Sequence, residues 1–364
     1  MGTMKLMAPV KLQPTEQQAD ALKHTIERAN EACNRLSERA WETRCFRQYA
    51  LHRLTYHDTR AEFPDLSSQV IVRCIARVAD AYKLDRKSRR EFGPLSAIPY
   101  DLRILHWYVE RSYVTIWTVG GRQKIPFICG ERQRELLKLQ QGESDLVYRK
   151  GEFYLYATCN VEEPPEGLPS GFLGVDLGVV NIAVDSDGEV HSASQVNNVR
   201  HRHRRLRRKL QRKGTRSAKR RLKKLSGKER RFAKDVNHCI SKHLVAKAER
   251  TMRGIALENL TGIRSRIRAR RSQRATLHSW SFADLRAKIA YKAQRAGVVV
   301  EYVDPRDTSR TCPICGCSDK RNRSDQSTFS CIACGYAGLA DYIASVNIRR
   351  RAVVNRPNVA GLMA

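Results

Sequence analysis

Residues 331–348 of the chain read CIACGYAGLADYIASVNI. A Cys-x-x-Cys pair ends at Cys334, and seven residues later Asp341 stands at the predicted start of a helix. Two interpretations of Asp341 are open. Its carboxylate caps the helix N-terminus, which is a common position for Asp, or it binds a metal ion together with acids from other parts of the chain. The rest of the sequence is needed to decide between a cap and a ligand.

A second Cys-x-x-Cys pair precedes this stretch. It is Cys312-Pro-Ile-Cys315, and fifteen residues separate it from Cys331. Four thiolates at this spacing can surround a Zn²⁺ ion tetrahedrally. Cys317 lacks the two-residue spacing, so the predicted ligands are Cys312, Cys315, Cys331 and Cys334. A closed four-thiolate site has no open coordination position, and we therefore expect one structural zinc ion and not a reaction centre.

Two further acids interrupt apolar segments. Asp176 lies in GFLGVDLGVV (171–180), and Glu258 lies in IALENL (255–260). Either one alone is compatible with an ordinary strand end that faces solvent. Together with Asp341 they can converge across one sheet, where divalent cations would neutralise their mutual repulsion. Two Mg²⁺ ions held there would activate a water molecule and stabilise the leaving oxygen in phosphodiester cleavage.

The charge of the chain indicates a polyanionic partner. The 364 residues include 68 Lys and Arg against 37 Asp and Glu, a formal charge of +31. Nucleic acid is the default partner for such an excess, and a membrane surface is the weaker alternative. Segment 200–234 holds nineteen Lys or Arg with Glu229 as its one acid, although a solvated or disordered face would look the same. The predicted nucleic-acid contacts are Arg204, Arg205, Arg207, Arg208, Lys209, Arg212, Lys213, Arg220, Arg221, Lys223, Lys224, Arg268, Arg270 and Arg271.

Other features concern the location of the protein. No apolar run approaches the length that spans a bilayer, and the N-terminal segment lacks the pattern of a signal peptide. Eleven cysteines without a secretory signal favour a reducing compartment. We expect a cytoplasmic protein, with neither a membrane nor a small-molecule substrate as partner.

The first part of the chain combines strands with a helical segment. Thr15 and Gln18 have capping-box spacing before a helical pattern, and a second helix is predicted from Ser67 or Ser68. Residues 114–129 predict a hairpin turned at Gly120-Gly121, and residues 146–161 predict another turned at Lys150-Gly151. A short strand in residues 4–12 would join them, which gives a small β-barrel with a helical insert. The Pro- and Gly-containing segment 162–171 is typical of a linker.

The motifs in the second part of the chain resemble a known family. Gly174-Val-Asp-Leu-Gly178, Leu257-Glu-Asn-Leu260, Thr308-Ser-Arg-Thr-Cys312 and the split zinc ribbon followed by Asp341 resemble TnpB. TnpB proteins are transposon-encoded RNA-guided endonucleases from which type V CRISPR effectors descend. The resemblance is dense over residues 173–350 and weaker before them. One position departs from the family pattern, because Ile343 stands where the family usually has Asn.

The resemblance implies an α+β multidomain fold. Residues 1–14 and 92–165 would form a split wedge-type β-barrel, and residues 15–91 a helical recognition insert. Residues 171–364 would form an RNase H-like (RuvC) α/β nuclease domain, with a zinc ribbon inserted at 308–338. Within it Asp176, Glu258 and Asp341 would be the catalytic acids that bind Mg²⁺. The implied partners are a guide RNA and a target double-stranded DNA.

The leading hypothesis is therefore an RNA-guided, Mg²⁺-dependent DNA endonuclease with a two-metal mechanism, which cleaves after the guide pairs beside a short adjacent motif. A nuclease-inactive, RNA-guided DNA-binding repressor of the same descent is one alternative, which Ile343 keeps open. An unguided zinc-ribbon RNA-binding protein is another. It accounts for the charge and the cysteines but gives no reason for Asp176 and Glu258.

Overall fold

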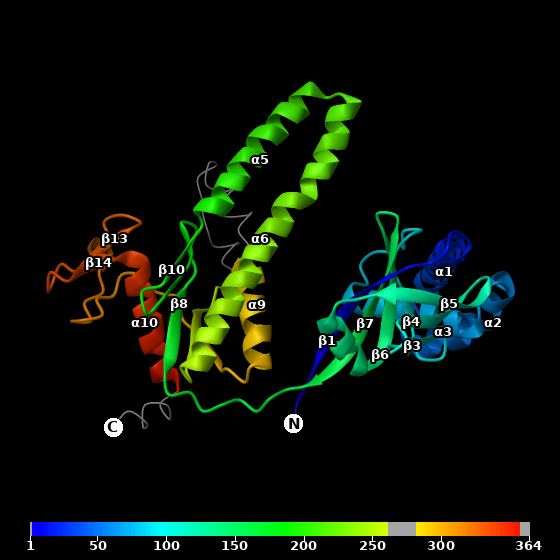
Figure 1. The fold of residues 1–364 in the computed structure, drawn as a ribbon, viewed down its shortest axis with the longest axis horizontal. Coiled ribbons are helices and arrows are strands. Elements are labelled where there is room, and N and C mark those ends of the chain that lie inside the picture. The colour runs from blue at the N-terminus through cyan, green and yellow to red at the C-terminus, as the bar shows by residue number, and fades with distance from the viewer. Residues whose placement is uncertain (1, 261–281, 357–364) are drawn as a thin grey trace. The chain divides into compact units, whose positions relative to one another are not determined.

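The computed structural model describes residues 2–260 and 282–356. The chain divides into two compact units at Glu162 (Figure 1). The first unit contains one seven-stranded sheet with helices, and the second contains a five-stranded sheet, a small two-stranded sheet and further helices.

The sheet of the first unit is antiparallel and has the order β2-β6-β7-β1-β5-β4-β3. Its two edge strands, β2 and β3, are joined directly by residues 101–104, so the sheet must curl until its edges approach each other. Trp107 Nε1 on β3 donates a hydrogen bond to Ser144 Oγ on β6, at 3.3 Å. The sheet is thus a nearly closed barrel. Its strands are β1 (Thr3–Leu12), β2 (Ile98–Tyr100), β3 (Leu105–Tyr108), β4 (Tyr113–Thr118), β5 (Gly121–Ile128), β6 (Gln140–Arg149) and β7 (Glu152–Glu162).

The two predicted hairpins are present, with one correction to a turn. Lys150 and Gly151 form the β6–β7 turn as predicted, with φ values of 57° and 86°. The β4–β5 turn lies one residue earlier than predicted, because Thr118 pairs with Gly121. The Thr118 hydroxyl accepts a hydrogen bond from the Gly120 amide and donates one to the Gly121 carbonyl, which closes the turn around Val119-Gly120.

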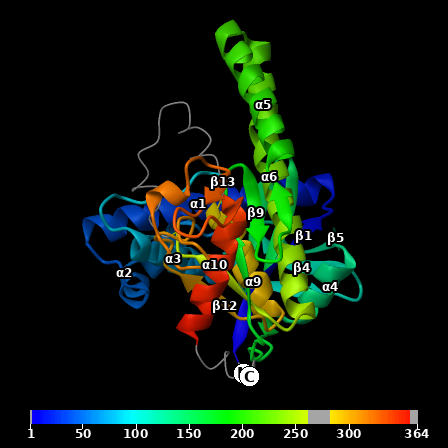
Figure 2. The same ribbon diagram turned by 90° about the vertical axis from the view of Figure 1, so that its left-hand side faces the viewer.

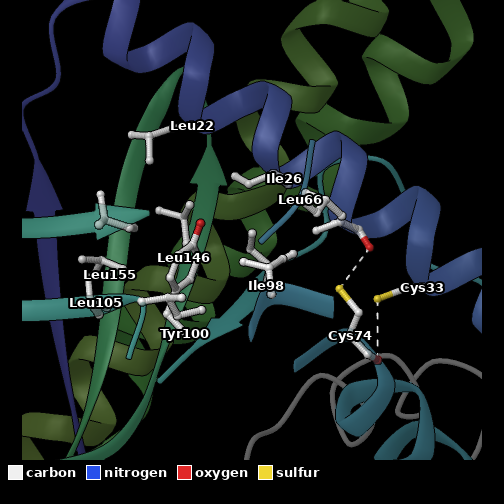
Figure 3. Packing of buried hydrophobic residues seen from close by; sticks show 14 of the residues in the cluster. Leu22, Ile26, Cys33, Leu66, Cys74, Ile98, Tyr100, Leu105, Leu146 and Leu155 are labelled. Atoms are coloured by element: carbon white, nitrogen blue, oxygen red, sulfur yellow. Dashed lines mark hydrogen bonds between the residues drawn. The ribbon is translucent and has the colours of Figure 1, made fainter. Parts of the chain in front are cut away.

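Three helices separate β1 from β2, namely α1 (Glu16–Glu42), α2 (Gln48–Glu62) and α3 (Ser68–Leu84). The capping box of Thr15 and Gln18 starts α1 as predicted. Sequence patterns did not single out α2, whose N-cap Arg47 makes no side-chain capping bond. Figure 3 shows Leu22 and Ile26 of α1 in the same core as Leu146 and Leu155 of the sheet. A short helix, α4 (Glu131–Lys138), connects β5 to β6.

The sheet of the second unit has the order β10-β9-β8-β11-β12. Strands β8, β11 and β12 run parallel, and β9 is antiparallel to both of its neighbours. A parallel arrangement requires crossover connections, and here helices supply them. The strands are β8 (Phe172–Asp176), β9 (Asn181–Asp185), β10 (Val190–Ser192), β11 (Gly254–Glu258) and β12 (Val300–Val303).

Helices cover both faces of this sheet. Leu173 and Leu257 pack with α6 (Arg216–Arg250) and α9 (Phe282–Arg295), whereas Phe172 and Ala256 pack with α10 (Ala340–Asn355). Residues alternate between the faces along each strand, as the pleat requires. Side chains that share the α10 face therefore occupy positions 172, 174 and 176 on β8 and 256 and 258 on β11.

Two helices form a hairpin that projects from this sheet (Figures 1 and 2). They are α5 (Ser194–Lys213) and α6, and Gly214 joins them in the left-handed conformation with φ of 64°. The segment predicted as a zinc ribbon, residues 308–338, contains the strand β13 (Thr328–Ser330) and the start of β14 (Ala337–Leu339). No helix in the described part of the chain combines the length and apolar character needed to cross a membrane.

Candidate active site

The three acids predicted as metal ligands occupy one end and one face of the second sheet. Asp176 and Glu258 are the last residues of β8 and β11. These strands are parallel neighbours in which Val175 lies opposite Leu257, so both strands end at the same edge of the sheet. Both acids also lie on the face that α10 covers. The register and the pleat together place the two carboxylates side by side.

Helix α10 brings the third acid to this edge. It crosses the sheet at Gly174, where a Cβ atom would lie 2.0 Å from the carbonyl oxygen of Ser345 and 2.6 Å from the amide nitrogen of Arg349. A residue with any side chain would push the helix away. The absence of a side chain at Gly174 thus sets how closely α10 approaches β8, and with it the position of Asp341 in the first turn of the helix.

Asp341 does not cap its helix. The N-cap position is Leu339, and no side chain makes a capping hydrogen bond there. The Asp341 Oδ2 atom instead accepts a hydrogen bond from Asn181 Nδ2, at 2.9 Å, and its Oδ1 atom lies 3.8 Å from the guanidinium of Arg323. The carboxylate therefore points toward β9 and the ribbon, and the capping interpretation does not describe its contacts.

The carboxylates of the site repel one another, and burial removes much of the water that would otherwise stabilise their charges. Burial raises the pKa of Asp176 well above its usual range, and the charges of Glu258 and Asp341 raise it further. Burial likewise raises the pKa of Glu258, while a hydrogen bond from the Thr308 hydroxyl opposes that rise. Carboxylates held together against repulsion are a suitable environment for a divalent cation. The oxygen donors of the three acids fit Mg²⁺, which prefers carboxylate ligands.

Three residues at this site were not identified from sequence patterns. Asn181 orients Asp341, Thr308 orients Glu258, and Arg323 of the ribbon places a positive charge beside the acids. Thr308 belongs to a motif noted in the sequence, but nothing there indicated its contact. The departure at Ile343 also has an explanation, because this side chain is fully buried and packs against the apolar core of the ribbon.

The four predicted zinc ligands are gathered in the structure. Their sulfur atoms all lie within 4.8 Å of one another, with 3.6 Å between Cys312 and Cys334 and 3.5 Å between Cys315 and Cys331. The amide of Cys334 lowers the pKa of the Cys331 thiol to about 6, whereas the pKa of Cys315 is raised to about 12, because hydrogen bonds with the other thiols outweigh the lowering effect of the Cys317 amide. The sulfur of Cys317 is outside this set, as predicted. The donor set and its closeness fit a zinc ion.

The ribbon is connected directly to the third acid. Strand β14 ends at Leu339, which is the N-cap of α10, so the ribbon and the helix that carries Asp341 share a boundary. The side chain of Arg323 reaches from the ribbon back to the same acid.

The predicted nucleic-acid contacts lie on the helical hairpin. Those within the described residues are all solvent-exposed on α5 or α6, although Arg207 also pairs with Glu229. They are Arg204, Arg205, Arg207, Arg208, Lys209, Arg212, Lys213, Arg220, Arg221, Lys223 and Lys224. The other three, Arg268, Arg270 and Arg271, lie outside the described residues.

Comparisons with known proteins match two successive segments of the chain to family models. Residues 156–263 match a family model described as a probable transposase, OrfB_IS605, and residues 282–348 match the Cas12f1-like TNB domain. A solved Cas12f1–sgRNA–target DNA complex superposes with a TM-score of 0.62 at 16% identity, covering 91% of this chain and 81% of that protein. This likeness establishes a shared fold.

Several curated proteins are related in sequence. A TnpB-like protein of Methanocaldococcus jannaschii is 37% identical over 131 residues, which are 36% of this chain and 46% of the relative. The Cas12f1 endodeoxyribonuclease of Sulfoacidibacillus thermotolerans is 41% identical over 128 residues, 35% of this chain and 29% of the relative. The matched regions span less than half the length of these relatives. Taken with the two family models, these similarities confirm the predicted resemblance to TnpB proteins and their Cas12f relatives.

Proposed function

We propose that this chain is an RNA-guided DNA endonuclease whose second unit is an RNase H-like, RuvC-type nuclease domain. The observation that carries the proposal is the convergence of Asp176, Glu258 and Asp341 from two parallel strands and a helix. The names of related proteins support a nuclease, since several are CRISPR-associated endodeoxyribonucleases. The proposed reaction is hydrolysis of DNA phosphodiester bonds.

The three acids, Asp176, Glu258 and Asp341, would hold Mg²⁺, and the proposed two-metal hydrolysis would use a pair of these ions. Bound Mg²⁺ would supply an activated water and neutralise charge on the phosphate. The protein's own contribution is to position the ligands. Asn181 holds one oxygen of Asp341, and Thr308 holds one oxygen of Glu258, so each carboxylate presents its other oxygen in a fixed direction.

The exposed cations of α5 and α6 would bind nucleic acid through its backbone. A heteroduplex of guide RNA and target strand is a suitable polyanion, and RNA-guided effectors bind such a duplex through its backbone without reading its sequence. Binding should weaken steeply with salt because each neutralised phosphate releases counterions. By the same proposal the barrel of residues 1–14 and 92–165 is the wedge domain and residues 15–91 are the recognition insert.

We expect Arg323→Ala to slow cleavage by about 10- to 100-fold with little change in DNA binding. The guanidinium of Arg323 faces the acids, where the scissile phosphate would lie, and a hydrogen bond to a charged group contributes about 1.5–3 kcal/mol. Single-turnover cleavage rates would measure this. Arg321→Ala is the matched control, because Arg321 is an exposed ribbon arginine that pairs with Asp319. Equal effects of the two substitutions would argue against a role for Arg323 at the site.

The function itself is tested by the RNA that co-purifies with the protein and by cleavage of a plasmid matched to that RNA. We expect a defined RNA species and cleavage that requires both the matching sequence and Mg²⁺. Asp176→Ala should bind the same plasmid without cutting it. Cleavage by Asp176→Ala at the wild-type rate would contradict the assignment of the site.

A second candidate function is an RNA-guided repressor that binds DNA without cleaving it. The buried Ile343 favours this candidate, since it replaces a polar residue of the family pattern with an apolar contact. The same plasmid experiment separates the two. Guide-dependent binding by the wild-type protein with no cleavage at any Mg²⁺ concentration would select the repressor, and binding without sequence dependence would exclude guided function altogether.

A further inference from the structure

A second group of metal-ligating side chains lies where the β9–β10 turn meets α6. Its members are Glu189 in the turn, His191 on β10 and His243 on α6. One ligand atom from each residue lies within 4.8 Å of the other two. Among the described residues, this group and the four cysteines are the two sets that meet this criterion. Nothing in the proposed nuclease mechanism uses it.

The distances in this group suit a transition metal. The Nε2 atom of His243 lies 2.8 Å from Glu189 Oε1, and the Nε2 atom of His191 lies 3.9 Å from the same oxygen. Ligands bound to zinc at about 2.0–2.1 Å in a tetrahedron are roughly 3.3 Å apart. The two observed distances lie on either side of that value, so small rotations of the side chains would complete the geometry.

His191 has a buried nitrogen atom without a partner. Its Nε2 atom is inaccessible to solvent and makes no hydrogen bond, and its ring lies edge-on to that of His243 with 5.4 Å between the centroids. A buried polar atom left unpaired costs free energy, and such atoms are uncommon in native proteins. A metal ion bound between the two imidazoles would give this nitrogen a ligand bond. The unpaired Nε2 atom of His191 is therefore a second indication of a bound metal ion, separate from the presence of the Glu189 carboxylate.

The charged side chains around this group carry a net negative charge, which a bound cation would neutralise. Lys247 Nζ lies 3.2 Å from Glu189 Oε2 and also binds Asp185 and Asp187, while Arg253 binds Asp187. Three carboxylates thus face two cationic side chains, and one negative charge remains unbalanced. Lys247 donates to the Oε2 oxygen of Glu189, and His243 Nε2 lies 2.8 Å from Oε1 and 3.0 Å from Oε2 of the same carboxylate. Such outer contacts orient the ligands of metal sites.

We propose that Glu189, His191 and His243 bind a divalent transition-metal ion, with zinc as the expected metal, which clamps the β9–β10 hairpin to helix α6. Two imidazoles and one carboxylate suit zinc and disfavour Mg²⁺. The His243 side chain is half exposed, so water would fill the fourth position. The clamp would fix the helix that carries the basic hairpin. This proposal does not depend on the proposed function, because it concerns only metal binding by the folded chain.

The test is the metal content of the full chain, purified with zinc and freed of loosely bound ions. The wild-type protein is expected to hold one zinc equivalent in the ribbon and one in the clamp. His191→Ala and His243→Ala should each lose one equivalent and keep the other. Replacing zinc with cobalt identifies the site that has lost its metal, because only cobalt bound by the ribbon cysteines gives thiolate-to-metal charge-transfer absorption. The control is His201→Ala, an exposed histidine of α5 outside the group.

A second measurement uses the unaltered chain and decides the question even if a variant fails to fold. Zinc, but not Mg²⁺, should protect His243 from carbethoxylation, with His201 modified equally under both conditions. A wild-type protein that holds only the ribbon's zinc would overturn the proposal. So would a second equivalent that survives both His191→Ala and His243→Ala, or a zinc-saturated protein in which His243 reacts as readily as His201.

Discussion

Asp341→Asn is expected to fold normally, bind guide RNA and target DNA, and cleave on the order of 10³-fold more slowly than the wild-type protein. The amide can still accept the hydrogen bond from Asn181, so the contacts of α10 should persist. What the variant loses is the negative charge that helps to hold a divalent cation. A metal ion contributes several kcal/mol to such a reaction, and about 1.4 kcal/mol corresponds to a tenfold change in rate.

The measurement is cleavage of a matched plasmid at saturating Mg²⁺, with binding and thermal melting followed in parallel. A helix-capping residue would tolerate this substitution, because Asn caps as well as Asp does. Cleavage at the wild-type rate would therefore show that Asp341 has no role as a ligand. A variant that melts much earlier than the wild-type protein would point instead to a structural role.

Cys331→Ser is expected to remove the ribbon's zinc, to unfold the ribbon and to abolish most of the cleavage even though all three acids remain. Zinc binding by four thiolates amounts to about 10 kcal/mol or more, and in small metal domains this is folding free energy. Beyond the zinc, the ribbon is held by a short hairpin, by the packing of Phe329 against Ile343 of α10, and by hydrogen bonds from Asn322 and Asn347 to its backbone. Without the metal, Arg323 and the start of α10 would lose their support.

Cys317→Ser is the matched control for this experiment. Cys317 belongs to the same ribbon and contributes a backbone carbonyl bond to Cys312, but its sulfur is not part of the four-cysteine set. Zinc content, melting temperature and cleavage rate should all fall in Cys331→Ser, and all three should remain near their wild-type values in Cys317→Ser. Full zinc content in Cys331→Ser would exclude the predicted ligand set.

Much of the architecture could be predicted from local patterns. Apolar runs located β8 and β11, and the acids at their ends were visible as interruptions. Cysteine spacing alone predicted which four sulfurs would meet. The Lys150-Gly151 turn was also readable, because two consecutive residues with positive φ favour Gly and tolerate few others. These features depend on residues close together in the sequence.

Features that depend on distant residues could not be predicted. The contact of Asn181 with Asp341 and that of Thr308 with Glu258 each join different elements of the second unit, and no local spacing encodes them. The pair of His191 and His243 was missed for the same reason, since β10 and α6 supply one ring each. The β4–β5 turn was misplaced because the Thr118 hydroxyl, and not the glycine pair, decides where the strands separate.

The close crossing of α10 over Gly174 has a consequence for the timing of activity during synthesis. The ribosome makes Asp176 first, Glu258 next and Asp341 last, so the third acid can reach the other two only after α10 has been made. Until then a nascent chain has two of the three acids and a complete basic hairpin, which by the proposal could already hold RNA. The proposed nuclease would thus acquire its RNA before it acquires the ability to cut, which would protect the DNA of a cell that translates it nearby.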